Sequence, residues 1–222
     1  MTPSSKKIFL TLLVILTLWL TLSPTVAAGK IDGFAVGSEG KEVYEIEKRL
    51  TRLSFNPGKV DEVYDIKTKF AVRAFQSVCG ISPTGVINEE TLKKLESPKK
   101  LQVEDKYIKD LIEVDLARQI LVLVSGGKVK YILPISSGRV GYDTPTGNYF
   151  VNGFLPGWHE VVNKPWTGMM YNSIYFWRSY AIHGSTSVPP YPASHGCIRI
   201  TSWDADLIYP LVQKWEMIII YK

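Results

Sequence analysis

The strongest constraint on the fold is a change in the spacing of apolar residues near residue 97. Before this point, apolar residues recur every three or four positions, the spacing of one helix face. They include Val43, Ile46, Leu50 and Leu53. After it, apolar residues alternate or run on as in strands, most clearly over Ile120–Val124. We therefore expect a multidomain chain in which a small all-α part is followed by a mostly β part.

Three short helices are expected between residues 33 and 96. The second carries an apolar face formed by Ala71, Ala74, Phe75 and Val78. It is expected to end at Gly80, because glycine readily adopts the left-handed conformation that stops a helix. The third is expected to begin after Asn88, a residue type favoured at the N-cap. The polar segment 97–107 is interpreted as a linker.

Residues 108–222 are expected to form a two-sheet sandwich. Ser125–Lys128 is a hairpin turn between the run Ile120–Val124 and the returning strand Val129–Ile135. Further strands are expected at Ile112–Leu116, Asn148–Val151 and Met217–Tyr221. Gly157–Glu160, which contains His159, is interpreted as irregular and without a functional role.

The segment Tyr171–Tyr180 is crowded with aromatic residues and has two interpretations. It packs within the core and on the surface, or it forms a lid or wall over a substrate cleft. Under the second interpretation, Tyr171 and Tyr175 are candidates for lining the cleft.

The N-terminus has the features of an export signal. Lys6 and Lys7 precede Ile8–Leu22, an uncharged apolar stretch that is short for a membrane span. Small residues up to Ala28 suit a signal peptidase, so residues 1–28 are expected to be cleaved; the alternative is an uncleaved anchor. Either way, the rest of the chain is expected outside the membrane.

The charge balance and the cysteine count bear on the partners of the protein and on its disulfide bonds. The net charge of +5 suits an anionic surface such as a cell wall, or simply a solvated surface. The sequence contains no long Lys/Arg cluster of the kind that would indicate nucleic-acid binding. The chain has two cysteines, Cys79 and Cys197, which are too few for a disulfide framework. One bridge between them can form in an oxidising compartment.

One short segment concentrates the reactive side chains. Two of the three histidines, His183 and His195, and one of the two cysteines, Cys197, fall within 15 residues. A thiol attacks acyl carbons as its thiolate, and a neighbouring imidazole takes the proton. Gly196 allows a tight turn and a close approach of substrate to the backbone. The cluster therefore indicates a cysteine acyltransferase or hydrolase.

Two other interpretations compete for the same residues. Zinc accepts imidazole and thiolate ligands, so His183, His195 and Cys197 are a conceivable zinc set. The chain has no His-Glu-x-x-His motif, and no acidic residue lies between His183 and Arg199 to act as a base. A wall-binding protein without catalysis is the second alternative, and acylation of Cys197 distinguishes it from an enzyme.

Both parts of the chain resemble known families. From Ile112 onward the chain resembles the L,D-transpeptidase (YkuD) family. The matching motifs are His183-Gly184, Ser194-His195-Gly196-Cys197-Ile198-Arg199, Thr144-Pro145-Thr146-Gly147-Asn148-Tyr149 and Trp203-Asp204-Ala205. The helical part resembles the three-helix peptidoglycan-binding domain. The matching residues there are Val60-Asp61, Thr68, Ala71-Val72, Phe75-Gln76, Gly80-Ile81, Gly85 and Thr91.

The helical part also departs from its family. Glu62, Asp65 and Asn88 stand where the family usually has glycine. Asp and Asn tolerate left-handed backbone, so those two changes are mild, whereas Glu62 is less easily accommodated. Wall binding by this part is therefore less secure than its fold.

The resemblance implies roles for the residues of the motif. Cys197 would be the nucleophile and His183 the general base, with the Gly184 carbonyl orienting the imidazole. Backbone amides from His195 to Cys197, including that of Gly196, would form an oxyanion hole. Ser194 and Arg199 would support the site, and His195 would line it.

The resemblance also implies a reaction and its partners. The enzyme would attack a peptidoglycan tetrapeptide stem, release the terminal D-Ala and transfer the acyl group to an amine of another stem. Water or a protein amine as acceptor would instead make it a carboxypeptidase or an anchoring enzyme. Peptidoglycan peptides and glycan are the expected partners, and carbapenems the expected inhibitors. No metal, cofactor or obligate protein partner is expected.

Overall fold

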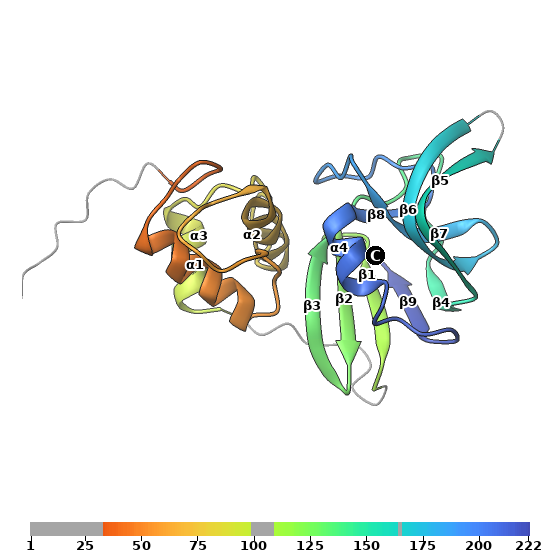
Figure 1. Ribbon diagram of the computed structural model, residues 1–222, viewed down its shortest axis with the longest axis horizontal. Coiled ribbons are helices and arrows are strands. Elements are labelled where there is room, and N and C mark those ends of the chain that lie inside the picture. The colour runs from red at the N-terminus through yellow and green to blue at the C-terminus, as the bar shows by residue number, and fades with distance from the viewer. Residues whose placement is uncertain (1–32, 99–108, 164–165) are drawn as a thin grey trace, which may run out of the picture. The chain divides into compact units, whose positions relative to one another are not determined.

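The computed structural model describes residues 33–98, 109–163 and 166–222 (Figure 1). The expected signal at 1–28 and most of the expected linker at 97–107 lie outside these residues. Within the described ranges, no helix has both the length and the apolar character needed to cross a membrane.

The described chain has the expected order of a helical part and a mostly β part (Figure 1). The helices of the first part are α1 (Lys41–Arg52), α2 (Ile66–Val78) and α3 (Glu89–Glu96). The second part contains nine strands and one helix, α4 (Ser202–Ile208). The strands are β1 (Leu111–Asp115), β2 (Ile120–Ser125), β3 (Lys128–Pro134), β4 (Gly147–Phe150), β5 (Gly153–Asn163), β6 (Trp166–Trp177), β7 (Tyr180–Ser185), β8 (Ile198–Thr201) and β9 (Met217–Tyr221).

Side-chain caps set the starts of two of the helices in the helical part. Asn88 caps α3 as predicted, its side chain accepting a hydrogen bond from the backbone amide of Thr91. Asp65 caps α2 in the same way, accepting from the amides of Lys67 and Thr68. Our reason for tolerating both residues was wrong, because φ is −91° at Asp65 and −97° at Asn88, which is not left-handed backbone. An acidic or amide side chain is favoured here because it satisfies helix N-terminal amides.

The strands form two sheets, as the sequence predicted. The five-stranded sheet has the order β3-β2-β1-β9-β4, and the four-stranded sheet has the order β5-β6-β7-β8. Most neighbours are antiparallel, but β1 pairs with β9 and β7 pairs with β8 in parallel. A core of aliphatic and aromatic side chains lies between the sheets and under α4.

Two expectations for the four-stranded sheet need correction. Gly157–Glu160 is not irregular: it lies in β5, where a shift of register between Leu155 and Trp158 accommodates Gly157 at φ 69°. The aromatic segment 171–180 is the end of β6 and the turn into β7, and it is not a separate lid. Phe176 belongs to the core, and Tyr171, Trp177 and Tyr180 pack against it, so packing accounts for four of the five aromatic side chains of the segment.

The five-stranded sheet is covered on both faces. Along β2, Leu121 and Leu123 belong to the core between the sheets. Their neighbours Ile120, Val122 and Val124 belong instead to a core that they share with the helical part. That shared core also contains Leu111 and Ile132 from the sheet and Leu50, Val72 and Phe75 from the helices. Residues 33–222 therefore pack as one compact unit.

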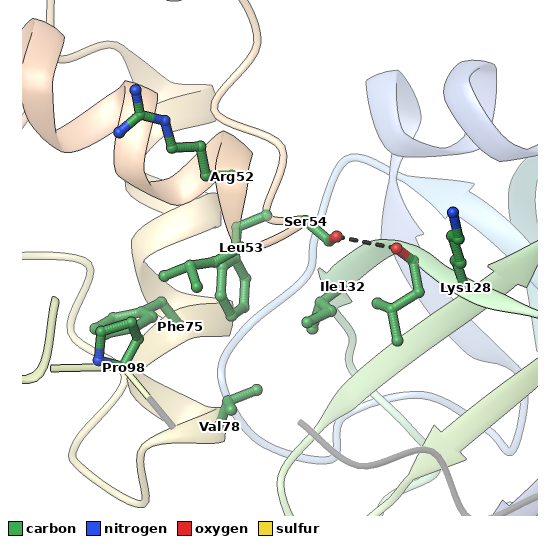
Figure 2. A pocket seen from close by; sticks show the side chains of 10 residues that line it. Arg52, Leu53, Ser54, Phe75, Val78, Pro98, Lys128 and Ile132 are labelled. Carbon is green, nitrogen blue, oxygen red and sulfur yellow. Dashed lines mark hydrogen bonds between the residues drawn. The ribbon is translucent and has the colours of Figure 1, made fainter. Parts of the chain in front are cut away.

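The edge strand β3 is also covered by the helical part. The backbone amide of Ile132 donates to the carbonyl of Ser54 at 2.8 Å, and the Ser54 hydroxyl donates to the carbonyl of Val129 at 3.0 Å (Figure 2). A cavity of about 300 Å³ lies beside this contact, lined mainly by apolar side chains, with Arg52 and Lys128 among its lining residues (Figure 2). The two hydrogen bonds satisfy one backbone donor and one backbone acceptor of this edge strand.

Candidate active site

The parallel pairing of β7 with β8 brings the reactive segments together. Its register sets Ile182 opposite Ile198 and His183 opposite Arg199. Ile182 and Ile198 face the core, so the alternation of side chains places His183 and Arg199 on the opposite face. Cys197 precedes β8 by one residue and lies two positions before Arg199. The same register brings Cys197 beside Ala181, two residues before His183 on β7.

His183 is held as a neutral, oriented imidazole. The side chain is 5% exposed, and its Nδ1 lies 2.9 Å from the carbonyl oxygen of Gly184. A carbonyl only accepts, so Nδ1 carries the proton and Nε2 keeps a lone pair. Burial lowers the pKa of His183 to about 4, against a small opposing effect of the Gly184 bond; Arg199 and His159 lower it further. At neutral pH, His183 is therefore a free base.

Gly184 must lack a side chain for this arrangement. A Cβ there would lie 3.0 Å from the Cβ of Ala205 and 3.0 Å from Cδ1 of Tyr171. Helix α4 therefore rests directly on the residue whose carbonyl orients His183. This packing couples the position of α4 to the orientation of the imidazole.

Cys197, which the resemblance implies is the nucleophile, is a half-buried thiol. Burial raises the pKa of Cys197, while a backbone hydrogen bond involving Ala181 and the charge of Arg199 lower it. The Sγ atom lies 3.8 Å from the carbonyl oxygen of Ser179, to which the thiol donates. Among the hydrogen bonds of the described residues, none joins the thiol to His183. Thiol and imidazole are therefore both uncharged at neutral pH in this structure.

The two cysteines are free, so the bridge between Cys79 and Cys197 is not formed. Cys79 caps the end of α2, and burial raises the pKa of its thiol. No group of three or more His, Cys, Asp or Glu side chains suited to holding a metal ion occurs in the described ranges. In particular, His183, His195 and Cys197 do not converge as a ligand set.

The turn before the nucleophile is held by Ser194 and Gly196. Ser194 Oγ donates to the carbonyl of Cys197 at 2.5 Å and accepts from the amide of Gly196 at 3.0 Å. Gly196 has φ 114°, and a Cβ there would lie 2.6 Å from the ring of Tyr180. Because Ser194 already takes the Gly196 amide, an oxyanion hole at this turn has to use its other amides.

Sequence reasoning missed the side chains that anchor this turn from elsewhere. Thr144 is 3% exposed; its hydroxyl donates to the carbonyl of Gly196 at 2.8 Å and accepts from the amide of Gly138 at 2.9 Å. The carbonyl of Ser137 accepts from the amides of Ala193 and Ser194, both at 2.9 Å. The Thr-Pro-Thr-Gly motif was noted as a family match, but its contact with the nucleophile turn is visible only in three dimensions.

His195 lies in different surroundings from His183. Its ring meets the edge of Tyr142, with ring centroids 5.0 Å apart, and the guanidinium of Arg139 lies 4.5 Å over that tyrosine. Burial and the charges of Arg139 and Arg199 lower the pKa of His195. The structure thus places His195 beside the nucleophile turn, next to an aromatic and cationic group.

The two tyrosines that were candidates for the cleft separate. Tyr175 pairs with Ala181, whose backbone is hydrogen-bonded to Cys197. Burial and then the charge of Cys197 raise the pKa of Tyr175. Tyr171 instead donates from its hydroxyl to Asp206 at 2.7 Å and packs beside Trp158, with ring centroids 5.0 Å apart. Of the two, the structure brings Tyr175 to Cys197.

Comparison with known proteins agrees with this architecture. Residues 109–220 match the L,D-transpeptidase catalytic domain (YkuD), and residues 39–95 match a peptidoglycan-binding domain. An L,D-transpeptidase structure from Xylanimonas cellulosilytica is 30% identical with a TM-score of 0.78, over 85% of this chain and 97% of that chain.

A second solved structure, an L,D-transpeptidase from Stackebrandtia nassauensis, is 21% identical. Its TM-score is 0.52, over 85% of this chain and 95% of that chain, and at this identity it shows the fold alone. A search of curated proteins finds no match. The catalytic-domain match covers half of the chain and includes both β7 and β8. The chain therefore belongs to the L,D-transpeptidase family.

Proposed function

We propose that this protein is an exported L,D-transpeptidase that cross-links peptidoglycan stems through a thioester on Cys197. The observation that carries the proposal is the pairing of β7 with β8, which supports a site where Cys197, at the start of β8, lies beside the strand that holds the oriented imidazole of His183. The peptidoglycan-binding match of the helical part supports a substrate in the cell wall.

In the first half-reaction, the thiol of Cys197 attacks the carbonyl of the L-centre of the third residue of a tetrapeptide stem. His183 Nε2 accepts the thiol proton as the carbon–sulfur bond forms, because both groups begin uncharged. The peptide bond to the terminal D-Ala breaks, and the proton passes from His183 to the departing amine. Backbone amides of the turn at 195–197 other than that of Gly196 would stabilise the oxyanion.

In the second half-reaction, an amine of another stem attacks the thioester carbonyl. His183 accepts a proton from that amine, the carbon–sulfur bond breaks, and the thiol of Cys197 recovers its proton. A new amide joins the two stems. Tyr175, which lies near the thiol, is proposed to line the donor site. Arg199 is proposed to support the nucleophile, since the charge of Arg199 lowers the pKa of Cys197 and so favours its thiolate.

The test is mass analysis of muropeptides incubated with the full chain and with Cys197→Ala. The proposal predicts dimers whose mass equals two stems minus one D-Ala in the first sample and none in the second. Tripeptides alone would make water the acceptor, and transfer to a protein amine would make the enzyme an anchoring one. Unchanged muropeptides would exclude the activity.

Covalent capture gives a second test of the nucleophile. A carbapenem should add once to the chain, through opening of its β-lactam ring by the thiol of Cys197, and this adduct should be absent from Cys197→Ala. An adduct that persists in the variant would move the nucleophile elsewhere.

Wall binding and export are separate parts of the proposal. Cys197→Ala cannot form a thioester, so its sedimentation with insoluble peptidoglycan measures non-covalent binding alone. Failure to sediment would mean that the departures at Glu62, Asp65 and Asn88 have removed binding. Export predicts that protein recovered from the cell envelope begins at Gly29; an intact Met1 there would indicate an uncleaved anchor.

A further inference from the structure

A buried cation in the helical part touches the segment that leads to Cys197. Arg73 lies in α2 and is 6% exposed. Its Nε is buried without a hydrogen-bond partner, and burial lowers the pKa of Arg73 to about 10. None of the ion pairs found in the described residues involves Arg73. Burial of a guanidinium without a carboxylate is costly, so the polar contact that it does make calls for an explanation.

That contact is a hydrogen bond to the β part of the chain. Arg73 Nη1 donates to the carbonyl oxygen of Val188 at 2.9 Å. The guanidinium also lies 4.5 Å over the ring of Phe70, whose edge meets Trp203 at the start of α4, with centroids 5.4 Å apart. The stem of Arg73 passes Gly85, where a Cβ would lie 3.1 Å from Arg73 Cγ. The side chain is therefore confined along its length, and the carbonyl that it binds has a fixed position.

Val188 belongs to the segment 186–197 between β7 and the nucleophile. The later half of this segment is anchored to the β part, because the Ser136 hydroxyl donates to the carbonyl of Tyr191 at 2.7 Å and Ser137 accepts from 193 and 194. The first half contains Val188, whose side chain is 6% exposed. Its hydrogen bond from Arg73 comes from a residue 115 positions away in the sequence.

The composition of the segment makes a fixed Val188 matter at Cys197. Pro189 and Pro190 follow Val188 directly, and Pro192 comes after Tyr191. Proline locks φ near −65°, so these residues transmit a displacement instead of absorbing it. Residues 191–194 are held by Ser136 and Ser137, and the Arg73 bond holds the first half of the segment, so a shift of the Val188 carbonyl would strain the anchors that lie next to the turn at 194–197.

We propose that Arg73 is a positioning residue for catalysis: by holding the Val188 carbonyl from the helical part, it fixes the segment that carries Cys197. The proposal rests on the proposed function of Cys197 as nucleophile. Arg73 does not contact the thiol and takes no part in the chemistry. The helical part, besides any wall binding, thus contributes one of the anchors of the segment that leads to Cys197.

The experiment compares Arg73→Met and Arg73→Lys with the wild type in the full chain. Methionine keeps much of the stem but removes the charge and the donors, whereas lysine keeps the charge and one donor group. The matched control is Ser54→Ala, which removes another side-chain hydrogen bond to a backbone carbonyl of the β part, at Val129. The readouts are the rate constant for acylation of Cys197 by imipenem, the rate constant for its alkylation by iodoacetamide, and the melting temperature.

Positioning predicts that Arg73→Met lowers the acylation rate constant by about 10- to 100-fold, since misplacement of a reacting group by 1 Å can cost about 10²-fold. Alkylation, which needs no oxyanion hole or oriented base, should change less. Arg73→Lys should recover part of the acylation rate. Ser54→Ala should keep the wild-type rate, because Val129 lies on β3 and not on the segment that leads to Cys197.

Two results would overturn the positioning role: a wild-type acylation rate in Arg73→Met, or an equal loss in Ser54→Ala at temperatures where both are folded. If Arg73→Met does not fold, Arg73→Gln carries the same test, since its polar head is too short to keep the bond to Val188. A wild-type protein that is alkylated at Cys197 but not acylated would instead overturn the proposed function.

Discussion

Removal of the helical part should unfold the β part, because the two share a core. Residues 109–222 contain all nine strands and α4, and by sequence alone they are a self-contained catalytic domain. In the structure, one face of the five-stranded sheet is covered by the helices. The aliphatic side chains of that face are Leu111, Ile120, Val122, Val124 and Ile132, which are between 0% and 3% exposed.

The size of the effect follows from these five side chains. Burial of one large aliphatic side chain is worth about 1.5–3 kcal/mol. Exposure of all five would cost roughly 7–15 kcal/mol as an upper limit, since neighbouring strands still cover part of each side chain. A typical domain is stable by about 5–15 kcal/mol. The loss is therefore comparable with the entire stability expected of the β part.

The assay is urea unfolding of the chain 33–222 and of the chain 109–222, followed by circular dichroism, with the soluble fraction after expression as a second measure. We expect cooperative unfolding of the longer chain. The shorter chain should be aggregated, or should lack a cooperative transition.

Threonine substitutions test whether the exposed face is the cause. Val122→Thr and Val124→Thr keep β-branched side chains on the shared face. They should raise the solubility of the shorter chain but lower the stability of the longer one. Leu123→Thr, on the face toward the other sheet, should lower both. A monomeric 109–222 that unfolds cooperatively with the stability of the longer chain would refute the reasoning.

Three further predictions concern the site. His183→Ala should lower the rate constant for acylation of Cys197 by roughly 10²–10⁴-fold, the usual contribution of a general base, and His195→Ala should lower it less. A larger loss in His195→Ala would show that His195, and not His183, is the base. Burial raises the pKa of Asp204 to about 6 from 3.8, so its contribution to stability is present at low pH and is lost as the pH rises through this interval. Asp204→Asn should therefore cost more free energy of unfolding at about pH 4 than at about pH 7, and a cost independent of pH would contradict the shift. Thr144→Val leaves the Gly196 carbonyl without its hydroxyl donor, which should destabilise the chain by about 1–3 kcal/mol and slow acylation; wild-type values of both would show that the contact is dispensable.

The local elements could be predicted because their signals are local. Asn88 starts α3 by capping it, and the Ser125–Lys128 turn joins two apolar runs that do pair as β2 and β3. The error at Gly157–Glu160 has the same origin. A glycine at positive φ is a reason to predict irregular chain, but in β5 it occupies a shift of register that a long strand accommodates.

The candidate reactive pair was also accessible from sequence, because a nucleophile and a base need particular side chains in a short interval. His183 and Cys197 are the side chains that the motif supplies. The protonation states of these two side chains could not be predicted from the sequence. Burial leaves His183 as a neutral base and raises the pKa of Cys197, so that the thiol and the imidazole are both uncharged. Burial depends on what packs around a residue, and the motif does not contain that information.

The run Ile120–Val124 shows which structural feature the sequence alone does not predict. Its apolar residues on both faces indicate a strand covered on both sides, but they do not say by what. The tertiary structure decides that one cover is the other sheet and the other is the helical part. It also decides that Arg73 reaches Val188 across 115 positions. Contacts at such separations depend on how whole elements dock. Any buried arginine can donate to any backbone carbonyl, so the sequence does not identify which carbonyl Arg73 binds.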